Sequence, residues 1–389
     1  MKSKLSRKLK VVLCLALAVA TVLCVGVLTS ADTVVAKIGD TGYATLADAI
    51  AAAEKDDTIV LADDIVLTEN AGVTIPAGLT VTLDLNGHHL SNNITEAAAS
   101  QVILNNGTLT IKDSSAGQTG SISTLSAPDS VGNWNISPRR NWQTVAVNNY
   151  GTLTLKSGKI VSTAAGGIAY AIDNMSGATL NVTGGTVETL GATEAIRMFV
   201  ASTTSANTVN ISGGTVTASG AVWIQACGKD GVAGVLNITG GVLNTKTGYR
   251  IVGFEADDPG TTLENVKVNV SGGKFSKSEE GTNTGYPFEI ENFGGATATF
   301  DPSYIELTGG TFWLNAYNHV KNSKEGTLED LCAKGYTVYE NTPEEGWYTV
   351  KKTTEASADT VVAKIDETEY ATLAEAIAAA KNDDTIVLA

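Results

Sequence analysis

The chain of 389 residues has few of the residues that build disulfide scaffolds or metal sites. Only four cysteines occur, and two of them, Cys14 and Cys24, fall in an apolar N-terminal stretch. Cys227 and Cys332 remain for at most one disulfide, which excludes a disulfide-stapled fold. The three histidines show no spacing suited to zinc, so the sequence predicts no metal and no cofactor.

Basic residues are also scarce, with 26 Lys and Arg against 41 Asp and Glu and a formal net charge of −15. Such a charge repels phosphate backbones and anionic lipid, so nucleic acid is excluded as a partner class. Aromatic residues make up only 6% of the chain, which suits a narrow core lined by Val, Ile, Leu and Ala.

The N-terminus predicts export. Five basic residues and no acid occur in MKSKLSRKLK, and an apolar run follows from Val11 to Leu28. This is the layout of a secretory signal with a cleavage site after Ala31, so residues 1–31 are predicted to be a signal peptide and the protein to be secreted or at the cell surface. The alternative is an uncleaved anchor, the one route by which this chain would meet a membrane. Loss of the segment takes the net charge to −20, because no acid precedes Asp32.

One short phrase recurs through the middle of the chain, mostly at intervals of 26 to 32 residues with longer gaps between some copies. Its clearest copies are LTLKSGKI from Leu153, LNVTGGTV from Leu180, VNISGGTV from Val209, LNITGGVL from Leu236, VNVSGGKF from Val268 and IELTGGTF from Ile305. In each copy apolar and polar residues alternate, as in a strand with one buried face, and a Gly-Gly turn precedes another short β segment.

A third strand precedes many copies and ends in Asn and Gly turn chemistry. Three strands in about 27 residues describe one coil of a parallel β-helix, an all-β solenoid in which each strand pairs with its counterpart in the next coil. We expect about eight or nine coils. Asn181, Asn210, Asn237 and Asn269 share one position in the phrase, which predicts a stacked amide ladder. The turn pairs Asn105-Asn106, Asn148-Asn149 and Asp173-Asn174 are interpreted in the same way.

The segment YATLADAIAAAEKDDTIVLADDIVLTENAGVTIPAGLTVTLDLNGHHL, with the Gly-Gly coils behind it, resembles the right-handed β-helix (pectate-lyase-like) repeat proteins of bacterial cell surfaces. The resemblance covers roughly Asp32 to Lys352. It implies the right-handed fold but not an activity, because that fold carries lyases, hydrolases and non-catalytic adhesins.

Both ends of the expected β-helix domain, residues 32–350, need covers. Apolar residues recur at helical spacing behind Thr45, so a capping helix is predicted over 46–54. A helical turn and a hairpin, Tyr336 to Tyr339 against Trp347 to Val350, are predicted to form a C-terminal cap over 326–350.

Residues 351–358 are predicted to be a linker, and 359–389 to begin a second, truncated β-helix module. The last segment repeats the first without gaps at an offset of 327, from Ser30/Ser357 to Ala62/Ala389. One interpretation is a fragment of a tandem array. The other is an orphan cap that docks on a neighbouring molecule, which would allow self-association through the C-terminal segment.

Four residues suggest a ligand-binding stripe. Tyr170, Arg197, Trp223 and Arg250 follow each other at 26 or 27 residues, which would place them in one outward row. Aromatic rings and guanidinium groups bind sugars by stacking and by charge-assisted hydrogen bonds. The alternative is a cation–π ladder that only stabilises the coils.

Trp134 and Trp142 lie in a long insertion that could also carry recognition, unless it is an ordinary side flap. Acidic loops near Glu255 and Ser278 could meet calcium, although solvated loops are the simpler interpretation. No catalytic residue is predicted, because no carboxylate set accompanies the arginines in the stripe.

We therefore expect an exported, non-catalytic adhesin, carbohydrate-binding or display module, with polysaccharide or host glycan as the partner class. The alternative is a polysaccharide lyase or glycoside hydrolase acting on the outer face of the β-helix. The enzyme would gain support if Asp173, Glu194 or Glu289 lay within about 6 Å of the arginines in an open groove. A third alternative is a structural spacer.

Overall fold

The structure is a computed structural model that describes most of the chain after the predicted signal peptide. The described residues are 33–68, 71–93, 100–125, 144–163, 169–191, 194–202, 204–226, 233–246, 250–256, 263, 265–277, 285–291, 302–319, 324–341, 346–353, 363–366, 368–370, 373–382 and 384–388. Residues 1–31, Trp134 and Trp142 lie outside them. Within these ranges no helix is long and apolar enough to cross a membrane.

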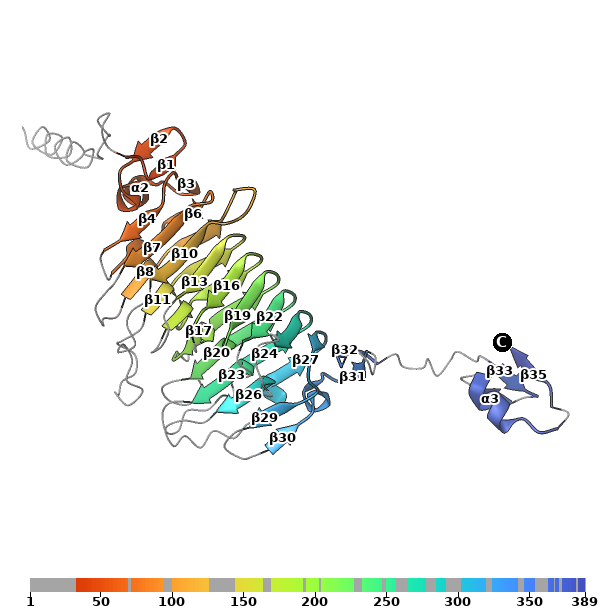
Figure 1. The fold of residues 1–389 in the computed structure, drawn as a ribbon. Coiled ribbons are helices and arrows are strands. Elements are labelled where there is room, and N and C mark those ends of the chain that lie inside the picture. Colours follow the sequence, from red (N-terminus) through yellow and green to blue (C-terminus); the bar gives the residue numbers. More distant parts are fainter. Residues whose placement is uncertain are drawn as a thin grey trace, which may run out of the picture.

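Three long sheets form the body of the molecule (Figure 1). Sheet A has the order β2 (Thr41–Tyr43), β1 (Ala36–Ile38), β3 (Asp57–Leu61), β6 (Thr80–Asp84), β9 (Thr108–Lys112), β12 (Thr152–Leu155), β15 (Thr179–Val182), β18 (Asn207–Ile211), β21 (Gly234–Ile238), β24 (Val266–Val270) and β27 (Ile305–Leu307). Sheet B has the order β31 (Tyr336–Glu340), β32 (Tyr348–Lys352), β28 (Thr311–Phe312), β25 (Lys274–Lys277), β22 (Val242–Thr245), β19 (Thr215–Ala218), β16 (Thr186–Thr189), β13 (Lys159–Ser162), β10 (Ser121–Leu125), β7 (His89–Asn93) and β4 (Ile65–Leu67). Sheet C has the order β30 (Lys324–Gly326), β29 (Tyr317–His319), β26 (Tyr286–Glu291), β23 (Arg250–Ala256), β20 (Gly220–Ala226), β17 (Glu194–Val200), β14 (Ala169–Asn174), β11 (Thr144–Asn149), β8 (Ser100–Asn105) and β5 (Val73–Ile75).

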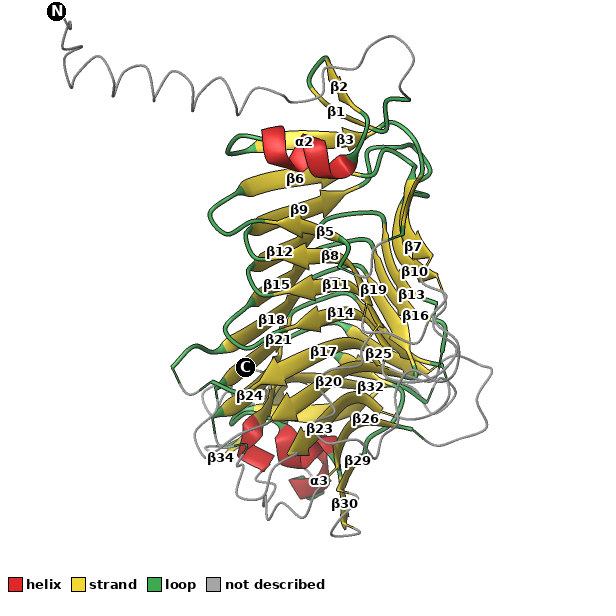
Figure 2. Cartoon of the chain, turned by 90° about the vertical axis from the view of Figure 1, so that its left-hand side faces the viewer, coloured by secondary structure: helices red, strands yellow, loops and turns green. Residues whose placement is uncertain are grey.

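The chain visits sheets A, B and C in turn, beginning with β3, β4 and β5 and ending with β27, β28 and β29. Each sheet therefore contributes nine parallel strands to nine described coils, and every strand pairs with the strand one coil away (Figure 2). The predicted parallel β-helix is confirmed. Alternation within the strands builds its core: Leu180 and Val182 of β15 are buried, whereas Thr179 and Asn181 point outward.

The two glycines of each Gly-Gly pair are required for different structural reasons. A Cβ on Gly213 would overlap the carbonyl oxygen of Thr183 in the preceding coil, so the first glycine of the pair is required by close stacking. Gly214 has a φ of +73°, in the left-handed region that favours glycine. The same pattern of a blocked Cβ followed by a positive φ recurs at Gly184-Gly185, Gly240-Gly241, Gly272-Gly273 and Gly309-Gly310.

A buried amide ladder runs along the turn from sheet C to sheet A. Asn105 donates to Asn149 at 2.7 Å, Asn149 donates to Asn174 at 2.6 Å, and Asn174 donates to Asn207 at 2.6 Å. All four side chains are fully buried. The turn-pair prediction included the first three members and missed Asn207.

The N-terminal end is covered by α2 (Leu46–Ala52), which ends two residues before the predicted Glu54. Thr45 caps it by accepting a hydrogen bond from the Asp48 N–H at 3.0 Å. Leu46, Ala49 and Ile50 form the buried face of the helix.

The C-terminal end is covered by the 3-10 helix η3 (Leu328–Leu331) and by the β31–β32 hairpin, which extends sheet B beyond β28. A second 3-10 turn, η1 (Pro302–Tyr304), precedes β27. Phe275, Phe288 and Phe312 pack together in the last coils, with the rings of Phe275 and Phe312 stacked at 4.5 Å. Strand β32 includes Lys351 and Lys352, so it runs into the predicted linker.

A small C-terminal unit consists of β33 (Ala363–Ile365), β34 (Thr368–Tyr370), α3 (Leu373–Ala379) and β35 (Ile386–Leu388). Its element order, strand, strand, helix and strand, repeats that of residues 36–61.

Candidate functional site

The four residues of the predicted stripe lie on sheet C but not in one row. Arg197 pairs in register with Trp223 on β20 and with Asp173 on β14, and Trp223 pairs with Gly253. Tyr170 pairs with Val145, and Arg250 pairs with Tyr286. In their strands, Tyr170 and Arg250 each lie three residues before the residue that belongs to the row of Arg197. Equal spacing in the sequence failed to give register because the connections between strands differ in length.

The stripe side chains point away from the central core yet are buried. Val145, Tyr170 and Trp223 form a cluster of their own, separate from the core that fills the β-helix. Arg197 is 3% exposed, Trp223 4% and Arg250 8%. The outer face of sheet C is therefore a second buried layer at these positions.

Arg197 is surrounded by partners in that layer. Its Nε and Nη2 donate to the two carboxylate oxygens of Asp173 at 2.9 and 2.5 Å, and Nη1 donates to Gln225 Oε1 at 3.0 Å. Its guanidinium carbon lies 5.2 Å from the ring centroid of Tyr170 and 5.0 Å from that of Phe199. This combines a bidentate ion pair with two cation–π contacts.

Arg250 joins two carboxylates from different coils. Its Nη2 lies 2.8 Å from Glu194 Oε1, and its Nη1 lies 3.5 Å from Glu289 Oε1. Asn318 donates to the other Glu289 oxygen at 3.2 Å. A Cβ on Gly253 would overlap the Arg250 side chain, so this glycine provides the space that the Arg250 side chain occupies.

Burial sets the protonation behaviour of two groups in this layer. Burial raises the pKa of Glu194 above its ordinary value, with Arg250 acting in the opposite direction. Burial also raises the pKa of the Tyr170 hydroxyl well above its ordinary value, against the attraction of Arg197. Both shifts favour the neutral form, as expected where water is excluded.

Trp223 contributes a polar atom that is not satisfied within this layer. The centroid of its indole ring lies 5.9 Å from that of Tyr170, while its buried Nε1 has no hydrogen-bond partner among the described residues. A buried indole N–H can donate to one hydroxyl or carbonyl oxygen.

The outer face of sheet A is a different surface, half-buried to exposed, on which neutral polar side chains form two long rows. One row in register consists of Thr80, Thr108, Thr152, Thr179 and Thr208. A parallel row two residues further along the strands consists of Thr58, Thr82, Thr110, Thr154, Asn181, Asn210, Asn237 and Asn269.

The predicted amide ladder occupies the second row of sheet A. Asn210 donates to Asn181 at 2.9 Å, Asn237 to Asn210 at 2.8 Å, and Asn269 to Asn237 at 2.9 Å. Each side-chain amide has two N–H donors and an oxygen with two lone pairs, and a ladder bond uses only one donor and one lone pair. A hydrogen-bonding array with the strand spacing of about 4.8 Å therefore remains on the surface.

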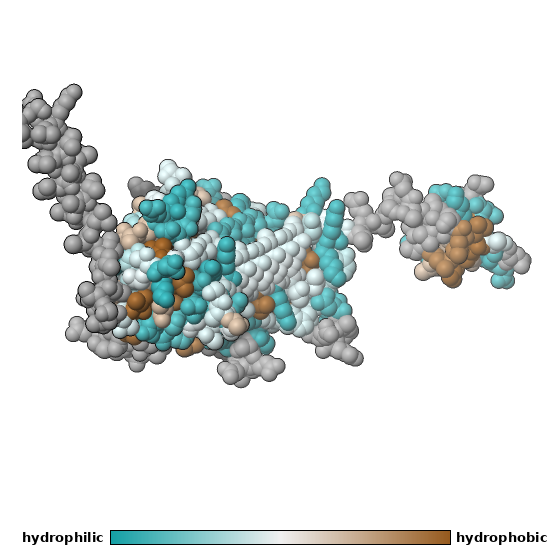
Figure 3. All heavy atoms as spheres, turned by 90° about the horizontal axis from the view of Figure 1, so that it is seen from above, coloured by the Kyte–Doolittle hydropathy of each residue, from teal (hydrophilic) through white to brown (hydrophobic). Residues whose placement is uncertain are grey.

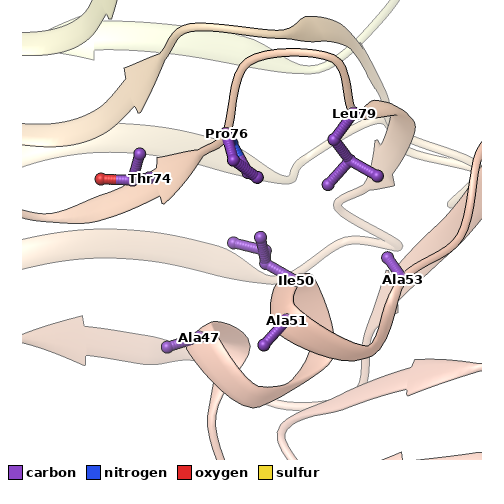
Figure 4. Close-up of a pocket in the computed structure, with 7 residues that line it drawn as sticks. All are labelled: Ala47, Ile50, Ala51, Ala53, Thr74, Pro76 and Leu79. Atoms are coloured by element: carbon purple, nitrogen blue, oxygen red, sulfur yellow. The ribbon is translucent and has the colours of Figure 1, made fainter. Parts of the chain in front are cut away.

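An apolar cleft of about 420 Å³ lies between α2 and the turn from β5 to β6 (Figure 4). Its lining residues are Ala47, Ile50, Ala51, Ala53, Thr74, Pro76 and Leu79. None of these lining residues is titratable, so they offer no acid or base. In the described part of the chain no three His, Cys, Asp or Glu residues group as metal ligands do, and Cys332 is a free thiol.

The sequence pattern identified Arg197 and Trp223 as neighbours and named Asp173 as a carboxylate that could lie near the arginines, but it missed Gln225. Asp173 and Gln225 lie one coil away on either side of Arg197, which only the register of sheet C reveals. The row of threonines on sheet A was visible in the sequence as a Thr directly before the phrases that begin at Leu153, Leu180 and Val209. Comparisons with protein-family models, with curated proteins and with solved structures gave no match.

Proposed function

We propose that this chain is a non-catalytic, exported β-helix module of the pectate-lyase-like type that binds or displays at the cell surface or after secretion, with carbohydrate as its ligand class. The observation that carries the proposal is the pairing of the stripe arginines with carboxylates in a buried layer. The carboxylates of Asp173, Glu194 and Glu289 all lie within about 6 Å of an arginine, which is the distance that an enzyme would require. Arg197 and Asp173 are buried, however, and do not line an open groove.

A polysaccharide lyase needs a basic group that can take a proton from substrate. Arg197 is held by both oxygens of Asp173, and separating a buried pair costs about 3–5 kcal/mol. These contacts favour a structural role for Arg197 and Asp173. The sugar-binding role of Tyr170, Arg197, Trp223 and Arg250 stays a prediction. It is supported by the Trp223 Nε1–H, which could donate a hydrogen bond to a sugar hydroxyl.

The outer face of sheet A supports the carbohydrate class. Its threonine hydroxyls and asparagine amides repeat from coil to coil. A polymer of hydroxyl-bearing rings that lies along the β-helix could therefore form similar hydrogen bonds in successive coils. Many weak hydrogen bonds of this kind give binding through multivalency rather than through one deep pocket.

One observation favours the enzyme as a second candidate. The carboxylates of Glu194 and Glu289 both form ion pairs with the guanidinium of Arg250. The pKa of Glu194 is raised, as it is in carboxylic acids that act as general acids. A glycoside hydrolase uses two carboxylates with separate roles.

A polysaccharide panel separates these candidates when binding and bond cleavage are read on the same samples. We expect binding without cleavage, weakened about fivefold by Thr179→Val on sheet A and unchanged by the matched Thr215→Val on sheet B, since one hydrogen bond is worth about 1 kcal/mol. Cleavage that Glu194→Gln abolishes would establish the enzyme instead. If neither binding nor cleavage is detected, the structural spacer becomes the favoured interpretation.

A further inference from the structure

The asparagine ladder on the outer face of sheet A is a directed chain of hydrogen bonds. Asn269 donates to Asn237 at 2.9 Å, and Asn237 donates to Asn210 at 2.8 Å. Asn210 donates to Asn181 at 2.9 Å, and Asn181 donates to the Thr154 Oγ1 at 3.3 Å. Every donor therefore points toward the preceding coil. Hydrogen bonds aligned in this way polarise one another, which gives the whole row one orientation.

The inner members of the ladder keep the groups that another amide needs. Asn181, Asn210 and Asn237 each use one N–H and one lone pair within the ladder, which leaves each of them a second N–H and a second lone pair. All three side chains are half-buried and reach the surface. They recur at the strand spacing of about 4.8 Å.

Methyl-bearing side chains lie beside the ladder. Thr179, Thr208 and Val235 are half-buried and lie in register with one another, each two residues before an asparagine of the ladder. Residues of a strand are about 3.3 Å apart, so the two rows run side by side about 7 Å apart. The regularity of the coils reaches the molecular surface, where Figure 3 shows groups of intermediate hydropathy, drawn white, in regular rows along the β-helix.

The charge of the chain favours a neutral polysaccharide over a charged one. From β15 to β21 both rows are uncharged, and the charged positions that follow are Lys267 in the first row and Glu306 in the second. The formal net charge of −15 repels uronate and sulfate groups. A glycan that this face recognises is therefore distinguished by a neutral substituent.

We propose that the ladder binds a neutral, N-acetylated glycan in an extended β-1,4-linked form, with its chain along the axis of the β-helix. This inference rests on the proposed carbohydrate-binding function and names the substituent that is recognised. An acetamido group supplies one N–H, one C=O and one methyl group. The N–H and C=O meet the remaining groups of the asparagine amides, and the methyl group packs against Thr179, Thr208 or Val235.

The repeat of such a glycan agrees with the repeat of the coils. One ring of an extended β-1,4-linked chain is about as long as the strand spacing, so successive rings stay in step with successive coils over a few strands. Successive rings alternate in direction, and every second acetamido group therefore faces the ladder. It meets asparagines two coils apart, either Asn181 and Asn237 or Asn210 and Asn269.

Titration calorimetry with two oligosaccharides of equal length tests this recognition on the chain without its predicted signal peptide. One probe is β-1,4-linked N-acetylglucosamine and the other is β-1,4-linked glucose, which differ only in the acetamido group of each ring. We expect the N-acetylated probe to bind about tenfold more tightly, because its acetamido groups add hydrogen bonds to the ladder. A galacturonate oligomer of the same length should bind more weakly than both.

A double variant, Asn210→Thr with Asn237→Thr, places this recognition on the ladder. It removes one asparagine from each alternate pair and should fold, because threonine already occupies this row at Thr110 and Thr154. We expect it to bind both probes equally. Asn244→Thr on sheet B is the matched control, because Asn244 donates to Thr217 at 3.3 Å in the same manner and should leave the preference unchanged.

Equal binding of the two neutral probes by the original chain would overturn the inference but not the proposed function, because the chain would still bind a glycan. A preference that survives the double variant, or that Asn244→Thr removes, would place the recognition elsewhere and overturn it as well. Tighter binding of the galacturonate oligomer would contradict a neutral ligand. Failure to bind any probe would also overturn the inference, and the polysaccharide panel then decides whether the proposed function fails with it.

Discussion

Arg197 donates two hydrogen bonds to the carboxylate of Asp173, 24 residues earlier, because β14 and β17 are neighbours in sheet C. Both side chains are buried, so neither charge can be screened by water if its partner is removed. We expect Asp173→Asn to lower the free energy of unfolding by about 3–5 kcal/mol in urea titrations. Glu188→Gln is the matched control, because the Glu188–Lys246 pair is 28% exposed at both side chains and should cost about 1 kcal/mol or less. Equal losses in the two variants would contradict a buried ion pair.

Acid should destabilise the fold through two buried turn carboxylates. Burial raises the pKa of Asp113, but hydrogen bonds from the N–H groups of Ser115, Gly120 and Gly87 outweigh it, and its pKa is lowered. The pKa of Asp84 is lowered in the same way, with burial opposed mainly by the N–H of Ser114 and by Lys112.

A carboxyl whose folded pKa lies below its unfolded value of about 3.9 stabilises the fold above that pH, and the contribution is lost as the pH falls through the folded pKa. Urea titrations from pH 7 to pH 2 should therefore show a loss below about pH 4. Asp113→Asn should be less stable at pH 7 and lose less on acidification. Asp40→Asn, at an exposed position, should follow the wild-type curve.

The repeating phrase was enough to predict the fold, since alternation gave the strands and the Gly-Gly turns gave the coil length. The register of sheet C was not predictable in this way, because Tyr170 and Arg197 are 27 residues apart yet belong to different rows. Burial of the stripe could not be inferred either, since alternation separates inward from outward residues and does not reveal a second buried layer.

The Gly-Gly turns should tolerate no side chain. Gly213→Ala places a Cβ against the Thr183 carbonyl oxygen, and overpacking of this kind costs about 1–3 kcal/mol. Gly214→Ala forces alanine to a φ of +73°, which costs about 1–2 kcal/mol by itself. Thermal unfolding should show both losses, while the exposed neighbour Ser212→Ala should change little. A neutral Gly213→Ala would mean that adjacent coils are further apart than the structure has them.

The two asparagine ladders should differ in energetic weight. Asn174→Ala leaves the Asn149 amide with one of its two acceptors, the Thr179 carbonyl, and leaves the Asn207 oxygen without the Asn174 donor, both in the buried interior. Each orphaned buried group costs about 1–3 kcal/mol, so we expect a total loss of about 2–5 kcal/mol in urea. Asn210→Ala removes equivalent bonds on the half-exposed ladder, where water replaces the lost partner, and should cost less than about 1 kcal/mol. Similar losses at both positions would contradict the assignment of one ladder to the interior.

The C-terminal unit should be able to act as a β-helix cap. It differs from the first cap only at Gly39/Asp366, Asp40/Glu367, Gly42/Glu369, Asp48/Glu375, Glu54/Lys381 and Lys55/Asn382. Gly39 and Asp366 have φ values of +55° and +54°, so aspartate already occupies this conformation in the unit. A variant of the first cap with all these substitutions except Gly42→Glu should lose no more than about 2 kcal/mol, mainly from Gly39→Asp.

Adding Gly42→Glu should cost more, because a Cβ there would lie 2.9 Å from both methyl carbons of Val34, and this valine must then move. Urea titration of the two variants measures that increment. A cap that fails to fold even without Gly42→Glu would show that the C-terminal unit has lost the ability to cover a coil, despite its identical apolar positions.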